Sequence, residues 1–154
     1  MAESIVPADF DGDGDVDLLR ASLLDDRIDW YENDGDGNFS SEILITSNVE
    51  APWEVFADDL DGDGDIDVLS SSQDDDKIAW YENDGDGNFS DQIVISSSIS
   101  NAISVRTADL NGDGHPDVIA SSLSDDNIVW FENDGDGSFD NDDFVRVGIS
   151  RNHD

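Results

Sequence analysis

Short apolar runs alternate with polar turn sequences along the whole chain, most clearly in its middle third. There WEVFADDL (53–60), IDVLSSS (66–72), KIAWYEN (77–83) and FSDQIVIS (89–96) follow one another, separated by residues rich in Asp and Gly. Asp-Gly pairs flanked by alternating apolar residues indicate hairpins, because glycine adopts the positive φ of a tight turn at low cost. No segment shows a sustained 3.6-residue apolar period with helix caps. The pattern predicts four short antiparallel strands and an all-β fold.

This unit occurs three times with a period of 50 residues. WYENDGDGNFS starts at residue 30 and again at residue 80, and returns as WFENDGDGSFD at residue 130. The same spacing relates DFDGDGDVD (9–17), DLDGDGDID (59–67) and DLNGDGHPD (109–117). Four-stranded units at this period are typical of propeller blades. We therefore predict a β-propeller of four-stranded antiparallel blades, with repeats at 1–50, 51–100 and 101–154.

The chain is strongly acidic. Its 154 residues include 40 Asp and Glu but 6 Lys and Arg, for a formal charge of −34. This charge repels nucleic acid and anionic membranes, and no apolar run is long enough to cross a bilayer. The chain has no cysteine, which excludes disulfides and thiolate metal sites. Aromatic and β-branched residues recur in register, which argues against acidic disorder. We expect no nucleic acid partner and no membrane insertion.

The acidic loop of each repeat has the spacing of a calcium-binding loop. Calcium takes about six to eight oxygen ligands, and alternate residues of a tight loop direct their carboxylates to one point. Positions 1, 3 and 5 carry these side chains, position 7 offers its backbone carbonyl, and position 9 closes the shell where a strand begins. The predicted ligands are Asp9, Asp11, Asp13, Asp15 and Asp17; Asp59, Asp61, Asp63, Asp65 and Asp67; and Asp109, Asn111, Asp113, His115 and Asp117. Because Asn111 keeps a side-chain oxygen and His115 would contribute only its backbone, we predict one Ca²⁺ per repeat and three per chain.

Other cation loops fit this pattern less well. Magnesium prefers few protein ligands and several retained waters. EF-hand and dockerin loops close with an acid at position 12, where this chain has Arg20, Ser70 and Ala120. The nine-residue period of calcium-binding β-helix repeats is absent. An acid at position 9, followed by a strand, distinguishes these loops.

DLNGDGHPDVIASS (109–122) and WYENDGDGNFS (30–40) resemble the VCBS and FG-GAP-like repeats, which are related to the repeats of the integrin α-chain propeller. The resemblance covers nearly the whole chain in three copies. It implies a propeller with one calcium ion per repeat between the first two strands of each blade, a secreted or cell-surface setting, and roles in adhesion or glycan binding. No GAP triplet follows the GNF and GSF segments, so the resemblance is to the bacterial-type repeats more than to integrins.

The second glycine-rich turn, NDGDGNF (33–39), is interpreted as a hairpin. Counted from Asp34, it has a phenylalanine where a calcium loop has the glycine of position 6. We expect the phenylalanine that ends it to anchor the outer strand in the core. This residue is Phe39, Phe89 or Phe139.

The tryptophan of each repeat is interpreted as core filling rather than as a platform for sugar rings, because an isoleucine lies two residues away on the same strand face. These residues are Trp30, Trp80 and Trp130. Trp53 has no aromatic equivalent in the other repeats, and it is either an exposed contact or locally packed.

Nothing in the sequence indicates catalysis. His115 and His153 have no nucleophile signature around them, and carboxylate pairs are uninformative in so acidic a chain. Extracellular calcium modules bind in the range of about 0.1 to 1 mM, far above cytosolic calcium, which favours an extracellular or surface location. We expect a binding or adhesion module with a glycan or protein ligand. The alternative is a self-assembling or engineered repeat fragment with no ligand.

The number of repeats predicts self-association. Propellers close with about four to eight blades, so three blades leave two apolar faces in water. We expect a homo-oligomer, most simply a dimer in which the first blade of one chain meets the third blade of the other and closes a six-bladed ring.

Overall fold

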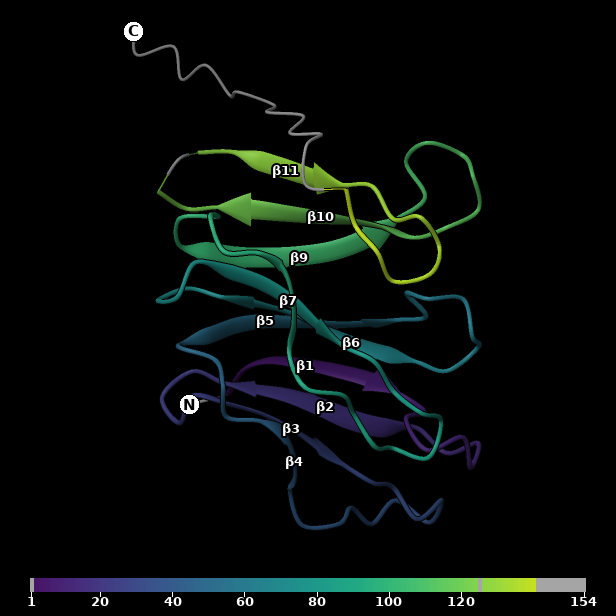
Figure 1. The fold of residues 1–154 in the computed structure, drawn as a ribbon. Coiled ribbons are helices and arrows are strands. Elements are labelled where there is room, and N and C mark those ends of the chain that lie inside the picture. Colours follow the sequence, from purple (N-terminus) through teal and green to yellow (C-terminus); the bar gives the residue numbers. More distant parts are fainter. Residues whose placement is uncertain (1, 125, 141–154) are drawn as a thin grey trace, which may run out of the picture.

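The computed structural model describes residues 2–124 and 126–140, and every regular element in these residues is a β-strand (Figure 1). The strands of the first repeat are β1 (Ala2–Ala8), β2 (Asp17–Ser22), β3 (Arg27–Tyr31) and β4 (Ile43–Thr46). Those of the second are β5 (Pro52–Asp58), β6 (Asp67–Ser72), β7 (Lys77–Tyr81) and β8 (Ile93–Ser96). Those of the third are β9 (Ala102–Ala108), β10 (Asp117–Ser122) and β11 (Ile128–Phe131).

Each repeat forms its own antiparallel sheet, in which the strands pair in chain order. The orders are β1-β2-β3-β4, β5-β6-β7-β8 and β9-β10-β11. The predicted all-β propeller architecture is confirmed, with four strands in each of the first two sheets. A fourth strand of the third repeat would fall in 141–154, outside the described residues.

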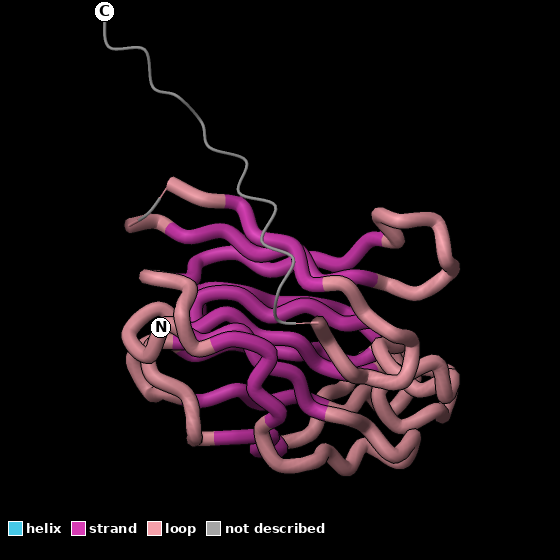
Figure 2. Tube along the Cα trace, turned by 45° about the horizontal axis from the view of Figure 1, so that its top comes forward, coloured by secondary structure: helices cyan, strands magenta, loops and turns pink. Residues whose placement is uncertain are grey.

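The three sheets stack face to face in a fan, with the first repeat at one end and the third at the other (Figure 1). The first strands of the sheets contact one another in the order β1, β5, β9. Figure 2 shows the strands as successive layers, with loops gathered at both edges. The loops that follow β1, β5 and β9 all lie at the edge drawn on the right of Figure 1.

The hydrophobic core lies between the sheets. One cluster joins the first two repeats: Phe10, Leu19, Ala21, Ile28, Trp30 and Val49 pack with Val55, Val68 and Tyr81. The other joins the second and third: Leu60, Leu69, Ile78, Trp80, Ile95 and Ile99 pack with Ala102, Val105, Val118, Ala120, Val129 and Phe131. The middle sheet is covered on both faces, and every residue of β6 is buried, whereas β2 in the end sheet has partly exposed residues.

Aspartates in the turns between the second and third strands tie neighbouring repeats together. The Asp26 carboxylate accepts a hydrogen bond from the Ala51 backbone N–H at 2.8 Å, and Asp76 accepts one from Asn101 at 2.8 Å. Both aspartates have positive φ. These bonds hold the start of each new repeat against the previous one.

Among the described residues there is no helix long and apolar enough to cross a membrane.

Candidate metal centres

The acidic loops connect the first two strands of each sheet. The last residue of the first strand pairs with the first residue of the second, as Ala8 pairs with Asp17. The same pairing joins Asp58 with Asp67 and Ala108 with Asp117. Each hairpin therefore encloses a loop of the same length, and its closing acid stands at the mouth of the second strand.

Backbone N–H groups hold the carboxylates of the first loop. The two Asp9 carboxylate oxygens accept hydrogen bonds from Gly12 N at 2.9 Å and Gly14 N at 3.0 Å. Both glycines have positive φ, which lets the backbone turn back toward Asp9. Asp11 accepts from Asp13 N at 3.2 Å, and Asp13 accepts from Asp15 N at 2.8 Å. The second and third repeats make the corresponding bonds at 2.6–3.1 Å.

The acid at position 9 is fully buried and joins the two turns of its repeat. Asp17 accepts a hydrogen bond from Phe10 N at 2.9 Å in the acidic loop and one from Asn33 N at 2.8 Å in the second turn. Asp67 and Asp117 make the same two bonds in their repeats. This residue is therefore a structural acceptor as well as a predicted ligand.

The fold brings the side chains of positions 1, 3 and 9 together in two repeats. One carboxylate oxygen from each of Asp9, Asp11 and Asp17 lies within 4.8 Å of the other two, and Asp59, Asp61 and Asp67 form the same group. These clusters could hold a metal ion, and their donors are all oxygens, which suit a hard cation. The third repeat has an amide at position 3, so it presents fewer carboxylates.

The side chains at positions 5 and 7 are not part of the groups formed by the acids at positions 1, 3 and 9. The aspartate at position 5, Asp13, Asp63 or Asp113, is not part of either three-acid group, and its carboxylate accepts the backbone N–H of position 7. The position 7 side chains of Asp15, Asp65 and His115 lie against a glycine of the second turn: Gly35, Gly85 or Gly135. The backbone carbonyl of position 7 stays a predicted ligand.

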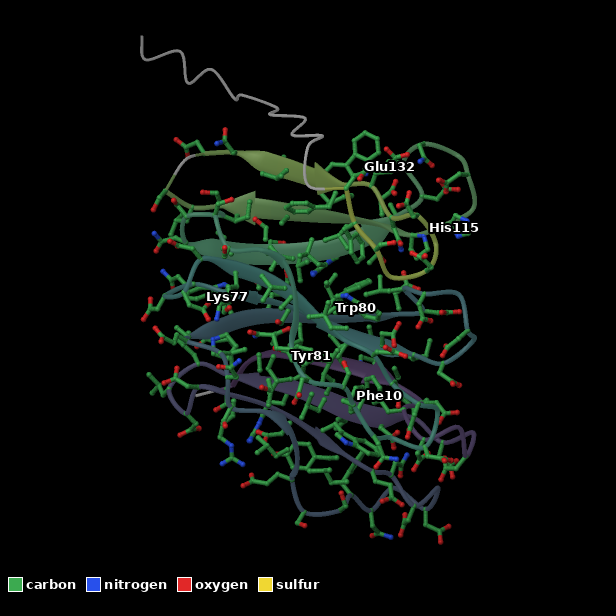
Figure 3. All side chains as sticks on the ribbon, viewed as in Figure 1. Phe10, Lys77, Trp80, Tyr81, His115 and Glu132 are labelled. Carbon is green, nitrogen blue, oxygen red and sulfur yellow. The ribbon has the colours of Figure 1, made fainter. Side chains whose placement is uncertain are left out.

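A glutamate beside the loop was missed by the sequence analysis. The Asn111 amide donates to Asp113 at 2.8 Å and to the Glu132 carboxylate at 2.8 Å. Glu132 therefore lies beside Asn111, the residue at position 3 of the third loop. Figure 3 shows Glu132 and His115 at the same end of the third sheet. The equivalents of Glu132 in the other repeats, Glu32 and Glu82, add negative charge near Asp11 and Asp61. The recurring "EN" before each second turn was the available signal.

Comparison with known families gives two overlapping matches to the FG-GAP-like repeat, over residues 9–70 and 59–120. The chain belongs to the FG-GAP-like repeat family. Each match begins at position 1 of an acidic loop and runs through the next loop into the following strand. No curated protein matches the sequence.

Two solved structures share the fold of these FG-GAP-like repeats. A lectin of Agrocybe aegerita that specifically recognises non-reducing terminal N-acetylglucosamine is 24% identical with a TM-score of 0.65, over 88% of this chain and 36% of the lectin chain. The V. cholerae biofilm matrix protein Bap1 is 23% identical with a TM-score of 0.50, over 88% of this chain and 19% of Bap1. The chain thus spans well under half of either protein, and the likeness establishes the fold.

Burial and like charge disfavour ionisation inside the FG-GAP-like loops. Burial raises the pKa of Asp67 to about 7, although two backbone N–H groups favour its ionised form. Burial also raises the pKa of Asp11 and of Asp61, and neighbouring carboxylates add to both shifts. A cation among these side chains would reverse the effect, because it favours the ionised state.

The second turn of each FG-GAP-like repeat is a hairpin, as predicted. The Asp34 carboxylate accepts from Asp36 N at 3.0 Å, from Asn38 N at 3.1 Å and from the Asn38 amide at 2.8 Å. The Asn38 side-chain amide is the largest cause of the lowered pKa of Asp34. Asp34 is therefore already held within its own turn.

The tryptophans of the first two repeats fill the core as predicted, whereas Trp130 is partly exposed. Trp30 and Trp80 are buried, and a β-carbon added to Gly87 or Gly137 would lie 2.6 or 2.5 Å from the ring of Trp30 or Trp80, respectively. Each indole therefore covers the second turn of the next repeat. Trp53 is about one-third exposed on β5.

The phenylalanines of the second turns contact the preceding repeat. Phe89 packs edge-on against Phe10 at a centroid distance of 6.0 Å, and Phe139 packs against Trp80 at 6.5 Å. Phe39 is 46% exposed, since none of the described residues covers it as Phe10 covers Phe89, so its predicted core position is wrong.

Proposed function

We propose that the chain is a non-catalytic, calcium-binding propeller module that acts in extracellular binding or adhesion. The observation that carries the proposal is the convergence of the position 1, 3 and 9 carboxylates in the first two repeats. The backbone bonds described above preorganise these side chains, so binding an ion requires little reordering of the loop. Calcium, when bound, would neutralise the carboxylates that otherwise repel one another.

The third repeat is included in the proposal. Asp109, Asn111 and Asp117 supply oxygens at the corresponding positions, and Asp109 and Asp117 keep the backbone bonds of their counterparts. Glu132 lies beside this loop and is a further oxygen donor within reach of position 3. We infer three calcium sites, of which the third is the weakest because Asn111 is neutral.

The ligand of the module would bind at the edge that carries the acidic loops. A cavity of ≈ 160 Å³ lies there between the first two repeats. It is lined by Asp9, Phe10, Gly12, Gly64, Asp65, Ile66, Asn83 and Gly85. Carboxylate and backbone groups suit the hydroxyl groups of a small polyhydroxylated ligand, so a glycan is favoured over a protein loop.

An extracellular or surface location is part of the proposal. Sites built from surface loops of this kind bind calcium at about 0.1 to 1 mM, and only extracellular calcium fills them. The alternative of a purely self-assembling protein is supported by the apolar end faces described below.

Isothermal titration calorimetry with CaCl₂ tests the metal sites, with three ions bound per chain as the expected result. Replacement of Asp9 and Asp59 by asparagine should leave one site. A glycan array probed in calcium and in chelator then tests the ligand: binding should require calcium. No heat of binding at millimolar calcium would overturn the metal sites, and an array without calcium-dependent binding would favour the assembly function.

A further inference from the structure

The two ends of the stack present the residue positions that are buried between the repeats. We define the leading face of the first repeat by Ile5, Leu18, Tyr31 and Asn33. We define the trailing face of the third repeat by Leu110, Ile119, Ile128 and Trp130. Within the chain, the leading-face positions of the second repeat pack on the trailing-face positions of the first, and the third repeat packs on the second in the same way.

The leading face exposes apolar side chains. Ile5 is 62% exposed, whereas its equivalents Val55 and Val105 are fully buried against the preceding repeat. Tyr31 is half-buried, whereas Tyr81 and Phe131 are buried. The difference arises because nothing in the described chain covers the first sheet on this side.

The trailing face is exposed in the same manner. Leu110 is 49% exposed, whereas Phe10 and Leu60 are buried. Ile128 is 37% exposed, whereas Ile28 and Ile78 are fully buried by the following repeat. The two faces are therefore the two halves of an interface that the chain already builds twice.

A buried amide joins the repeats at both internal interfaces. Asn83 Nδ2 donates to the Phe10 carbonyl at 2.8 Å, and Asn133 Nδ2 donates to the Leu60 carbonyl at 2.7 Å. Asn33 makes the local bond to Val16 O at 3.0 Å but, among the described residues, no bond to another repeat. The Leu110 carbonyl is the equivalent acceptor at the other end. One end therefore carries the donor and the other the acceptor.

The contact between a tryptophan and a glycine of the next repeat also has one partner at each end of the stack. Trp30 and Trp80 lie against Gly87 and Gly137 of the following repeat. At Gly37, on the leading side, no atom lies within 4 Å of an added β-carbon. Trp130 is the indole that would cover such a glycine.

The leading face also contains a charged cluster whose central acid, Asp29, has no counterpart in the other two repeats. Asp29 is fully buried beneath Arg20 at 2.5 Å and Arg27 at 3.2 Å, where other repeats have Ala79 and Val129. Glu42 lies 3.4–3.5 Å from both guanidinium groups. The cluster has equal numbers of positive and negative groups, so covering it leaves no charge without a partner.

We infer that the leading face of the first repeat binds the trailing face of the third repeat of a second copy of this chain. In that junction Asn33 would donate to the Leu110 carbonyl of the partner copy, and the partner's Trp130 would cover Gly37. A closed ring of three-blade chains has a multiple of three blades, and six is the multiple that lies within the usual range of about four to eight. Two copies therefore close one ring, with two equivalent junctions.

The inference rests on the proposed function in one respect. Two chains of formal charge −34 repel each other, and bound calcium reduces that repulsion. Association should therefore be strongest in calcium.

Light scattering during size-exclusion chromatography in calcium tests the inference. The wild-type chain should elute with twice its mass of 16.8 kDa. Ile5→Glu and Ile128→Glu each place a charge in the junction and should weaken association at least about 100-fold. The matched control Leu24→Glu changes an exposed residue in the turn after β2 and should stay dimeric.

Mixing the two interface variants distinguishes head-to-tail docking from contact between like faces. The Ile5→Glu chain keeps its trailing face and the Ile128→Glu chain keeps its leading face, so at high concentration the mixture should form a two-chain species that neither variant forms alone. A wild-type monomer in calcium, with these faces covered by some other partner or by none, would overturn the inference. So would a dimer that survives either variant.

Calcium titration of the two variants separates this inference from the proposed function. Both variants should bind calcium and show a cooperative melt as monomers, which excludes misfolding as the cause of dissociation. A dimer that binds no calcium would contradict the proposed function but not the interface. A monomer that binds calcium would contradict the interface but not the calcium sites.

Discussion

Each repeat contains two acidic, glycine-rich turns of similar composition, and the fold treats them differently. In the first, carboxylates from Asp59, Asp61 and Asp67 come within 4.8 Å of one another, and burial raises the pKa of Asp67 to about 7. In the second, Asp84 accepts bonds from Asp86 N and from Asn88, and these bonds lower its pKa. Acidic composition therefore does not make a metal site. The decisive feature is an acid at the buried start of the next strand, which closes the first turn and is missing from the second.

The largest expected effect is removal of calcium, which should act through the first turns alone. A ligand at a hundred times its dissociation constant contributes about 2.7 kcal/mol per site, so three sites contribute about 8 kcal/mol. At about 2 to 4 °C per kcal/mol for a chain of this size, chelation should lower the melting temperature by roughly 15 to 30 °C. Calorimetry in calcium and in EDTA measures the difference. An equal melt in both buffers would contradict a structural role for the ion.

The next largest effect is the loss of stability on substituting an aspartate in the first turn, compared with a matched substitution in the second turn. Asp67→Asn removes a predicted ligand and leaves one of two buried N–H groups, of Leu60 or Asn83, without its acceptor. In calcium it should cost about 4 to 6 kcal/mol, from the lost site and the unpaired donor. The control Asp84→Asn changes an exposed turn and should cost about 1 kcal/mol or less. Denaturant unfolding measures both, and equal losses would remove the distinction between the turns.

The pH dependence should have opposite signs with and without calcium. In calcium-free protein the pKa of Asp67 is raised from 3.8 to about 7, so the folded state holds a proton that the unfolded state releases. The resulting stabilisation, up to about 4 kcal/mol, is complete below about pH 4 and is lost as the pH rises through 7. In calcium the ion requires the ionised carboxylate, so stability should instead rise from pH 5 to pH 8.

Unfolding in EDTA and in calcium at pH 5 and pH 8 measures this reversal. Asp67→Asn should reduce the pH dependence of the calcium-free protein, because the substituted residue does not titrate. The same trend with pH in both buffers would show that calcium does not bind at this carboxylate.

The smallest expected effect compares the loops with one another. Asn111→Asp restores the acid that the first two repeats have at position 3, but it also removes the amide that donates to Asp113 and Glu132. In calcium we expect about tenfold tighter binding at the third site, or about 1.4 kcal/mol. In EDTA the extra charge should instead lower the melting temperature. Calorimetric titration would refute this if the third site became weaker.

Local pattern was sufficient for much of the fold. The 50-residue period, the strands and the glycine positions of the turns follow from short-range alternation and from the φ that glycine allows. The convergence of positions 1, 3 and 9 was predicted because alternate residues of a tight loop face one point. Asp13 was predicted to be a ligand, but its carboxylate accepts the Asp15 N–H and lies outside the three-acid group, and spacing alone does not distinguish these two roles.

Contacts across long sequence separations lay beyond this reasoning. Glu132 reaches Asn111 from 21 residues away, and Asn83 reaches the Phe10 carbonyl across 73 residues. Neither hydrogen bond follows from the sequence of a single hairpin. The bond from the Asn83 side chain to the Phe10 carbonyl forms only because the two sheets stack.

The sequence by itself determined that the chain is a set of three equivalent sheets with oxygen-rich loops, because strand alternation and turn chemistry act within a few residues. The tertiary structure decided which equivalent positions differ. Val55 is buried and Ile5 is exposed, although their local sequences predict the same strand face. Burial depends on what packs against a face, and only the stacked sheets show where the stack ends.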